Sequence, residues 1–148
     1  MTKLRIRDYE PEDFLNIEVS EREMEARKEM PLVRWALFKK IAGPAYTVVD
    51  PEGQIVGCGG VHNLWPGVGE VWMVLSPLAK KYPYIWMATK KLLSGMAQGY
   101  VRLQAVVDSE YLEAMRFSER LGFRLEGQML RYGPHGENSV LYALVKEN

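Results

Sequence analysis

The sequence has 148 residues, which is the length of one domain with enough apolar side chains for a core of its own. Its 19 Lys and Arg residues balance 19 Asp and Glu residues, so no large net charge would draw the protein to nucleic acid or to an anionic membrane. The single cysteine, Cys58, excludes an internal disulfide, and the absence of a long apolar stretch or a signal peptide makes a cytoplasmic location the expectation.

The first third of the sequence predicts one strand and three helices. Leu4 and Ile6 alternate with basic residues, as expected for a strand with one buried face. Pro11 favours the first position of a short helix, because a proline has no amide to leave unpaired there. The charge-rich stretch 20–41 is interrupted by Pro31, so we expect two helices that are separated at this proline.

An antiparallel meander of three strands is expected next, followed by a helix over 83–99. The segments 45–50 and 54–61 flank a Pro-Glu-Gly turn, and a second turn over 65–69 leads into a strand at 70–75. The glycines within 54–61 would weaken an ordinary strand. They therefore predict a bulge or a close approach of another backbone at that place.

The last third contains the most regular pattern of the sequence. Apolar residues at alternate positions over 101–107 predict a strand, and Asp108 and Ser109 offer side-chain oxygens that would cap a helix. Gly122 lies where such a helix would end in a left-handed residue, and a final strand is expected over 139–145. Strands and helices in this order predict an α/β domain with a mixed sheet.

Two stretches resemble the GNAT superfamily of acyl-CoA-dependent N-acyltransferases. The opening LRIRDYEPEDF is similar to the strand and first helix with which many of these chains begin, and 101–127 resembles the strand, helix and Leu-Gly-Phe of their carboxy-terminal half. The matching residues there are Ala114, Leu121, Gly122 and Phe123. The resemblance implies a single GNAT-like domain over 1–148, with a mixed, mostly antiparallel sheet flanked by helices on both faces. A generic strand-helix-strand unit would give the same local pattern.

The resemblance implies acetyl-CoA as the cofactor, with its pyrophosphate held by the loop and helix start that follow the fourth strand. Counted from Pro77, the family's Gln or Arg, Gly, and Gly or Ala positions fall on Lys80, Pro83 and Ile85, and all three depart from the pattern. One lost charge-assisted hydrogen bond would weaken CoA binding by about ten- to hundred-fold, part of which the lysines restore. The expected cofactor-binding residues are Met73, Val74, Leu75, Lys80, Lys81, Tyr82, Tyr84 and Ile85. The alternative is that the two lysines belong only to a solvated turn.

The family's reaction, direct attack of an amine on the acetyl thioester, suggests which residues would be catalytic. A lysine amine has a pKa near 10.4 and needs a base at pH 7. Glu70 is the candidate, because the fourth strand carries the base in several GNAT enzymes, and His62 is the second choice. Ser118 and Tyr111 occupy the positions of the family's thiolate-protonating tyrosine and of an asparagine, and with Ser109 they are the candidate substitutes. Each of these residues also has a structural interpretation.

The resemblance thus implies an acetyl-CoA-dependent N-acetyltransferase that acts on a primary amine. The expected partner is a small-molecule or peptide amine, a homodimer is left open, and no metal, nucleic acid or membrane partner is expected. The alternative is a catalytically degenerate GNAT-fold protein with a binding or assembly role, which the loop departures and the missing tyrosine favour. Segments 71–82 and 114–123 also resemble divergent GNAT-like proteins of tailed phages. The sequence does not specify the acceptor amine.

Overall fold

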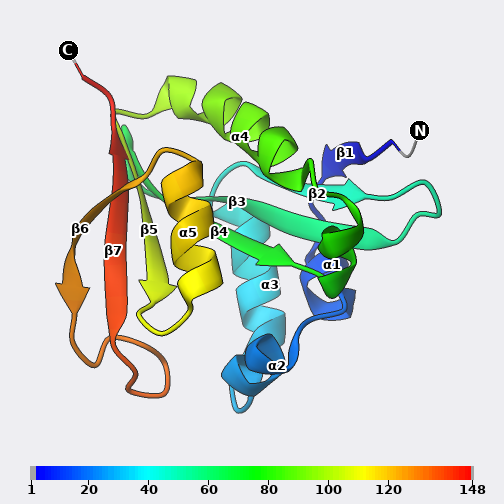
Figure 1. Ribbon diagram of the computed structural model, residues 1–148, viewed down its shortest axis with the longest axis horizontal. Helices are drawn as coiled ribbons and strands as arrows, with labels where there is room; N and C mark the ends of the chain where they lie inside the picture. The colour runs from blue at the N-terminus through cyan, green and yellow to red at the C-terminus, as the bar shows by residue number, and fades with distance from the viewer. Residues whose placement is uncertain (1–2, 148) are drawn as a thin grey trace. The chain divides into compact units, whose positions relative to one another are not determined.

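The computed structural model describes residues 3–147, and its strands and helices follow the predicted order (Figure 1). The strands are β1 (Arg5–Asp8), β2 (Ala45–Val49), β3 (Ile55–Trp65), β4 (Val68–Leu75), β5 (Arg102–Asp108), β6 (Arg124–Met129) and β7 (Ser139–Val145). The α-helices are α1 (Pro11–Asn16), α2 (Glu21–Arg27), α3 (Leu32–Ile41), α4 (Ile85–Met96) and α5 (Leu112–Arg120). Two short 3₁₀ helices are η1 (Pro77–Lys81) and η2 (Ala97–Gly99).

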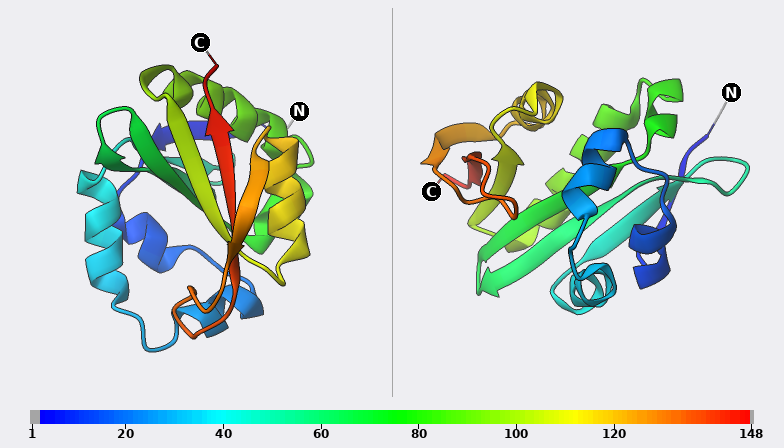
Figure 2. Two further views of the ribbon diagram at one scale, coloured as in Figure 1. Left: turned by 90° about the vertical axis from the view of Figure 1, so that its left-hand side faces the viewer. Right: turned by 90° about the horizontal axis from the view of Figure 1, so that it is seen from below.

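The strands of residues 3–147 form one seven-stranded sheet in the order β1-β2-β3-β4-β5-β7-β6. β1 with β2, β2 with β3, β5 with β7 and β6 with β7 pair antiparallel, and β4 with β5 pair parallel. The expected α/β fold with a mixed, mostly antiparallel sheet is therefore confirmed. Both views of Figure 2 show β5 running beside β7, which lies between β5 and β6.

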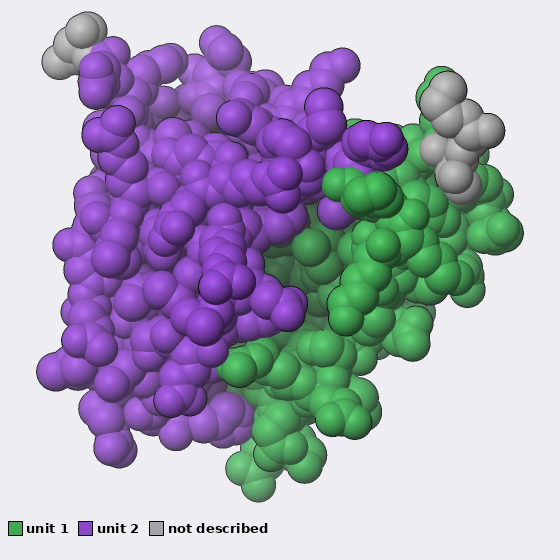
Figure 3. Space-filling model, viewed as in Figure 1, with its two compact units in different colours: residues 1–62, 72–83 green, residues 63–71, 84–148 purple. Residues whose placement is uncertain are grey.

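Two compact units divide the described chain, and Figure 3 colours them separately. The first consists of residues 1–62 and 72–83, and the second of residues 63–71 and 84–148. The chain changes unit three times: within β3, within β4, and between η1 and α4.

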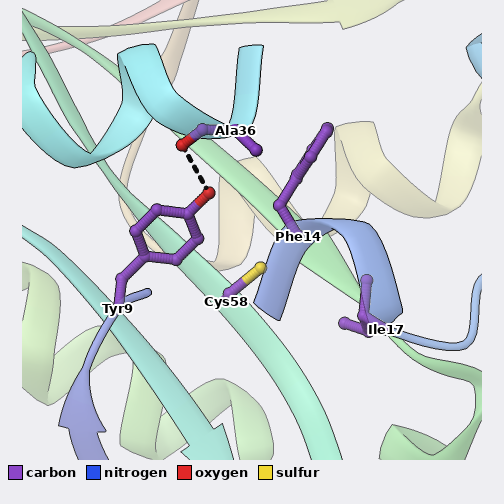
Figure 4. Close-up of a cluster of buried hydrophobic side chains, with 5 residues drawn as sticks. All are labelled: Tyr9, Phe14, Ile17, Ala36 and Cys58. Carbon is purple, nitrogen blue, oxygen red and sulfur yellow. Dashed lines mark hydrogen bonds between the residues drawn. The ribbon is translucent and has the colours of Figure 1, made fainter. Parts of the chain in front are cut away.

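The core of the first unit is a cluster of five buried side chains, which come from α1, α3, β3 and the residues that follow β1 and α1 (Figure 4). They are Tyr9, Phe14, Ile17, Ala36 and Cys58. The hydroxyl of Tyr9 donates a hydrogen bond of 2.9 Å to the carbonyl oxygen of Ala36, so the one polar atom of this ring is satisfied inside the cluster. Burial of an aromatic or aliphatic side chain contributes about 1.5 to 3 kcal/mol. This contact therefore fixes α3 on the sheet of its own unit.

The second unit has its core between α5 and the strands β5, β7 and β6. Leu103 and Ala105 of β5 and Tyr142 of β7 are buried, as the alternation over 101–107 predicted. Gly122, with φ +105°, follows the last residues of α5 in the left-handed conformation expected for it. The predicted strand-helix-strand order is therefore confirmed in this unit.

The start of α5 differs from the prediction. The helix begins at Leu112, and neither Asp108 nor Ser109 caps it. Instead Oδ1 of Asp108 accepts a hydrogen bond from the amide of Glu110 at 2.9 Å, and its carbonyl accepts one from the amide of Tyr111. Asp108 thus closes a turn ahead of the helix, because an Asp side chain satisfies a turn amide two residues on as readily as a helix amide.

Two further details differ from the sequence pattern. Ile6, expected on the buried face of the first strand, is 47% exposed, and Tyr9 beyond the strand is the fully buried residue. The turn predicted over 65–69 is shorter, because β3 extends to Trp65 and Gly67 adopts the positive φ of a tight hairpin. Among residues 3–147, no helix has both the length and the apolarity needed to cross a bilayer.

Candidate functional site

The end of β4 lies unusually close to β3. A Cβ atom added to Gly59 would lie 2.7 Å from the carbonyl oxygen of Trp72, and one added to Gly57 would lie 2.8 Å from Cδ2 of Leu75. Only glycine fits at position 59, since real Cβ atoms are not found that close to a backbone oxygen, whereas at position 57 the side chain of Leu75 would have to shift. The close approach predicted from these glycines is confirmed. The approach involves Met73, Val74 and Leu75, which were expected to bind the cofactor.

The parallel pairing of β4 with β5 covers only the beginning of β4. The register runs from Val68 with Arg102 to Glu70 with Gln104, whereas β4 itself continues to Leu75. Glu70, the candidate base, therefore lies in the last register pair.

The loop after β4 is fixed by Ser76. Its buried hydroxyl oxygen accepts a hydrogen bond from the amide of Leu78 at 3.1 Å, and its own amide donates to the carbonyl of Val56 at 2.9 Å. The first hydrogen bond caps η1 and the second joins the loop to β3. Pro77 fits directly after Ser76, because a proline has no amide that would need a partner at the start of a helix.

Tyr82, one of the expected cofactor-binding residues, has its side chain engaged within the first unit. Its hydroxyl donates to Oδ2 of Asp50 at 3.3 Å, and Oδ1 of Asp50 accepts from the amides of Glu52 and Gln54. Burial and the negative charge of Asp50 raise the pKa of Tyr82. Tyr82 therefore ties the end of the loop to the turn between β2 and β3. The sequence pattern gave no signal for Asp50.

The other loop residues differ in where their side chains lie. Lys80 and Lys81 are exposed, and so is Tyr84, at 72%. Ile85 is only 8% exposed, so its branched side chain is turned into the protein rather than outward from the first turn of α4. No side-chain hydrogen bond caps this helix at Tyr84. The amide of Met87 donates to the carbonyl oxygen of Tyr84 at 3.0 Å, so the capacity for another acceptor is limited to the amides before it, those of Ile85 and Trp86.

Glu70 belongs to a chain of hydrogen bonds within the second unit. Nε2 of Gln104 donates to Oε1 of Glu70 at 3.0 Å, and Nε of Arg102 donates to Oε1 of Gln104 at 3.1 Å. Arg102 also donates twice to the carboxylate of Glu126, at 3.0 and 2.6 Å. The hydrogen bond between the two charged groups raises the pKa of Arg102 and lowers that of Glu126. Sequence reasoning identified Glu70 but missed the three residues that hold it.

Of the candidate proton donors, Ser118 lies on α5 and Tyr111 directly precedes this helix. Ser118 is buried and its hydroxyl donates to the carbonyl of Ala114, one turn earlier in the helix, at 2.9 Å. Tyr111 occupies the residue before the helix, and its amide donates to Asp108.

A buried tyrosine that the sequence reasoning missed, Tyr142, is hydrogen-bonded to Glu119, the residue that follows Ser118 on α5. The hydroxyl of Tyr142 on β7 donates to Oε2 of Glu119 at 2.7 Å. Burial and this carboxylate raise the pKa of Tyr142 to about 12, so the phenol stays protonated at neutral pH. The apolar run SVLYALV gave no hint of this pair, because it has the pattern of an ordinary core strand.

His62, the second choice for the base, is enclosed by aromatic rings of the first unit. Its ring is stacked on Trp72 with the centroids 6.1 Å apart and meets Phe38 edge-on at 5.0 Å. Burial and the nearby ammonium of Lys39 lower the pKa of His62 to about 4. Its Nε2 and the Nε1 of Trp72 have no hydrogen-bond partner within the described residues. His62 is thus neutral at pH 7 and a weak base.

Cys58 is a buried residue of β3. Burial raises the pKa of the Cys58 thiol to about 12, which fits a small buried strand residue rather than a nucleophile. Across residues 3–147, no group of three or more His, Cys, Asp or Glu side chains is arranged to hold a metal ion.

Solved structures provide the comparison with known proteins. No family model matches the sequence, and no curated protein sequence is significantly similar to it. A GNAT-family acetyltransferase from Bacillus anthracis has a TM-score of 0.73 at 21% identity, over 98% of this chain and 96% of that one. A ribosomal-protein-S5-alanine acetyltransferase from Vibrio fischeri has a TM-score of 0.69 at 19% identity, over 98% and 94%.

A spermidine N-acetyltransferase from Vibrio cholerae, solved in complex with CoA and spermine, has a TM-score of 0.73 at 15% identity, over 97% of this chain and 96% of that one. Likeness at such identities concerns the fold. The chain thus has the fold of the GNAT acetyltransferases along nearly its whole length, as the sequence resemblance implied.

Proposed function

We propose that this chain, with the fold of the GNAT acetyltransferases, is an acetyl-CoA-dependent N-acetyltransferase that acts on a primary amine. The observation that carries the proposal is the likeness of fold over 97–98% of the chain to enzymes of that activity, including one solved with CoA and spermine. We also propose that residues 1–148 act as one catalytic domain, because the two compact units share β3 and β4.

The cofactor site is assigned to the residues after β4. The first amides of α4, left without a side-chain cap, suit the pyrophosphate of CoA, and the helix dipole adds a positive potential there. Lys80 and Lys81 are exposed and contribute two ammonium groups. The buried side chain of Ile85 supports this assignment, since a side chain that points into the protein does not block a phosphate group from the amides at the start of α4. Pro83 lacks an amide, which is why we expect affinity below that of the family's usual loop.

The chemistry assigned to the protein consists of proton removal and charge stabilisation. Bound acetyl-CoA supplies an activated acetyl thioester. Glu70 accepts a proton from the attacking ammonium, and a backbone amide within Met73–Leu75 donates to the oxygen on which negative charge develops. The thiolate of the leaving group, with a pKa near 8.5, is only about 2 kcal/mol from balanced protonation at pH 7. Tyr111 and Ser118 are the residues assigned to that last proton transfer, which is helpful rather than essential.

The acceptor is proposed as a class. The Vibrio cholerae relative in fold is named for spermidine, and the Vibrio fischeri one for the alanine of a ribosomal protein. For this chain we propose a primary amine on a small molecule or a peptide, in the cytoplasm. A homodimer, to be checked by light scattering, is the one further partner that we propose.

Calorimetric titration with acetyl-CoA tests the proposal directly. We expect a Kd between about 10 µM and 1 mM, since the changed loop costs roughly ten- to hundred-fold relative to micromolar binding. Lys80→Ala with Lys81→Ala should weaken binding about tenfold. The matched control, Lys90→Ala with Lys91→Ala, removes two exposed lysines from the middle of α4 and should leave binding unchanged. A wild-type Kd above about 1 mM would refute the proposed acetyltransferase activity and favour the alternative, a GNAT-fold protein with a binding role.

A further inference from the structure

Four side chains in the second unit form an uninterrupted row that ends at Glu70. Its members are Glu126 of β6, Arg102 and Gln104 of β5, and Glu70 of β4. Arg102 and Gln104 are two residues apart on one strand, so their side chains leave the same face of the sheet. The register places Gln104 beside Glu70 on the neighbouring strand. Strand register therefore brings the side chains of Glu70, Gln104 and Arg102 next to one another.

The chemistry of the row gives it a direction. A guanidinium has only donors, so the amide oxygen of Gln104 must face Nε of Arg102, at 3.1 Å. The amide nitrogen of Gln104 must then face the carboxylate of Glu70, which has only acceptors when ionised, at 3.0 Å. The usual ambiguity in the orientation of a glutamine amide is thus removed by its two neighbours. Gln104 cannot rotate about its amide without losing both hydrogen bonds.

Arg102 is itself fixed by Glu126. The two carboxylate oxygens of Glu126 accept from the two terminal nitrogens of Arg102, which leaves Nε as the nitrogen that points to Gln104. The register between β6 and β7 shifts between Leu125 and Gly127, at Glu126. A bulge of this kind redirects a side chain from its regular position. The irregularity in β6 and the row across the sheet therefore coincide at one residue.

Glu70 is held by a neutral amide and has no direct contact with the positive charge of Arg102. A cation in direct contact with a carboxylate lowers the pKa of that carboxylate by about 1 to 3 units, which weakens it as a base. Here the positive charge of Arg102 is matched by Glu126, and a neutral amide stands between Arg102 and Glu70. The amide binds Oε1 of Glu70, and Oε2 is the second oxygen of the group.

We propose that Gln104 is a positioning residue for Glu70, held in place by Arg102 and Glu126, so that Oε2 of Glu70 receives the proton of the acceptor amine. The inference rests on the proposed acetyltransferase function and deepens it. The first proton leaves the substrate ammonium for Glu70, and the nitrogen lone pair set free by this step forms the new bond to the acetyl carbon. The C–S bond of the thioester would break in return, and the second proton lost by the nitrogen would leave with the thiol. Gln104 does not itself exchange a proton.

Gln104→Leu is the first test, with thiol release followed for a lysine-type amine. We expect kcat to fall roughly tenfold while the calorimetric Kd of acetyl-CoA stays unchanged, because only the base loses its orientation. Gln128→Leu is the matched control, since it makes the same change on an exposed residue of β6 and should leave both quantities unaltered. Arg102→Met should lower kcat as much as Gln104→Leu does, because Gln104 depends on Arg102 for its orientation.

Gln104→Glu supplies a readout that a purely structural role would not move. A second carboxylate beside the first disfavours ionisation of the pair, so the acidic limb of the pH profile of kcat/KM should shift upward by roughly one pH unit. An unshifted limb together with an unchanged kcat in Gln104→Leu overturns the proposal.

The double variant Glu70→Gln with Gln104→Leu separates the two levels of inference. If Gln104 acts through Glu70, Gln104→Leu has no further effect on kcat in the Glu70→Gln background. The same tenfold loss in both backgrounds refutes the positioning role and leaves Glu70 as the base. If Glu70→Gln alone keeps the wild-type rate with a lysine-type amine, the assignment of the base fails, and the positioning role fails with it. Acetyl-CoA binding without any turnover overturns the proposed function itself.

Discussion

Two sets of ionisable side chains, Cys58 and His62 in the first compact unit and Arg102 and Glu126 in the second, are stabilised in opposite charge states. In the first unit, burial raises the pKa of Cys58 to about 12 and lowers that of His62 to about 4, so both are uncharged at neutral pH. In the second unit, Arg102 and Glu126 each stabilise the charged form of the other. A group held neutral by an apolar surrounding is a poor partner for a proton, whereas the carboxylate of Glu70 is bound by a neutral amide and not by an apolar surrounding. The comparison therefore favours the row of polar side chains that ends at Glu70, rather than His62 or Cys58, as the place of the proposed proton transfer.

The largest effect expected from this comparison is that of Glu70→Gln. We expect kcat with a lysine-type amine at pH 7 to fall at least a hundredfold, because about 4 to 5 kcal/mol separates that ammonium from its reactive form. An α-amine, with a pKa near 7.8, should lose much less. Steady-state thiol release with both amines measures the difference. Glu110→Gln, a change at an exposed residue of the same unit, is the control and should leave both rates intact. Equal losses with the two amines would contradict a role as base.

Gly59→Ala should have the next largest effect, on the stability of the first unit. The new Cβ would lie 2.7 Å from the carbonyl oxygen of Trp72, so β3 and β4 must move apart. We expect the free energy of unfolding to fall by about 1 to 3 kcal/mol in urea titrations.

Gly127→Ala in β6 is the matched change in the second unit. Nothing lies within 4 Å of a Cβ added there. The stability should change by less than about 0.5 kcal/mol. A similar loss in both variants would show that the first unit is no more tightly built at β3 than the second unit is at β6.

A smaller effect is expected from the protonation of His62. Since burial lowers the pKa of His62 to about 4 in the folded protein, below the value near 6.5 of an unfolded chain, the unfolded state binds the proton more readily. The stabilising contribution is complete above pH 6.5 and is lost as the pH falls toward 4. In His62→Phe, which keeps an aromatic ring beside Trp72, the decline in the urea midpoint between pH 7 and pH 5 should be shallower than in the wild type. An identical decline would mean that other groups cause it.

The smallest effect is expected for the ion pair of the second unit. The hydrogen bond from Arg102 lowers the pKa of Glu126 below its unfolded value, so the pair stabilises the protein at neutral pH and is lost as the pH falls through the folded pKa. Both side chains are partly exposed, and salt screens such pairs. Glu126→Gln should therefore leave the urea midpoint at pH 7 within experimental error. A clear loss of stability would show that the row has a structural role larger than its positioning one.

The local elements were predictable where a single residue restricts the backbone. Pro31 separates α2 from α3, Gly122 ends α5, and the alternation over 101–107 places Leu103 in the core. These outcomes depend on φ restrictions and on side-chain period, both of which are written in the sequence.

The candidate site was predictable only in part. Glu70 and the loop residues were identified from the family resemblance. Asp50, Gln104 and Tyr142 were not, because their partners are 32, 34 and 23 residues away in sequence. Hydrogen bonds over such distances depend on strand register and burial. Asp108 shows the same limit on a smaller scale, since the sequence offered it two equivalent local partners.

By itself, the sequence determined the order of the strands and helices, the glycines at which β3 and β4 approach, and the resemblance to an acyltransferase fold. Only the tertiary structure decided that Ile85 faces inward, that Tyr82 is tied to Asp50, and that Glu70 is oriented by a glutamine. The physical reason is that backbone restrictions act within a few residues, whereas the orientation of a side chain is set by the neighbours that folding brings to it.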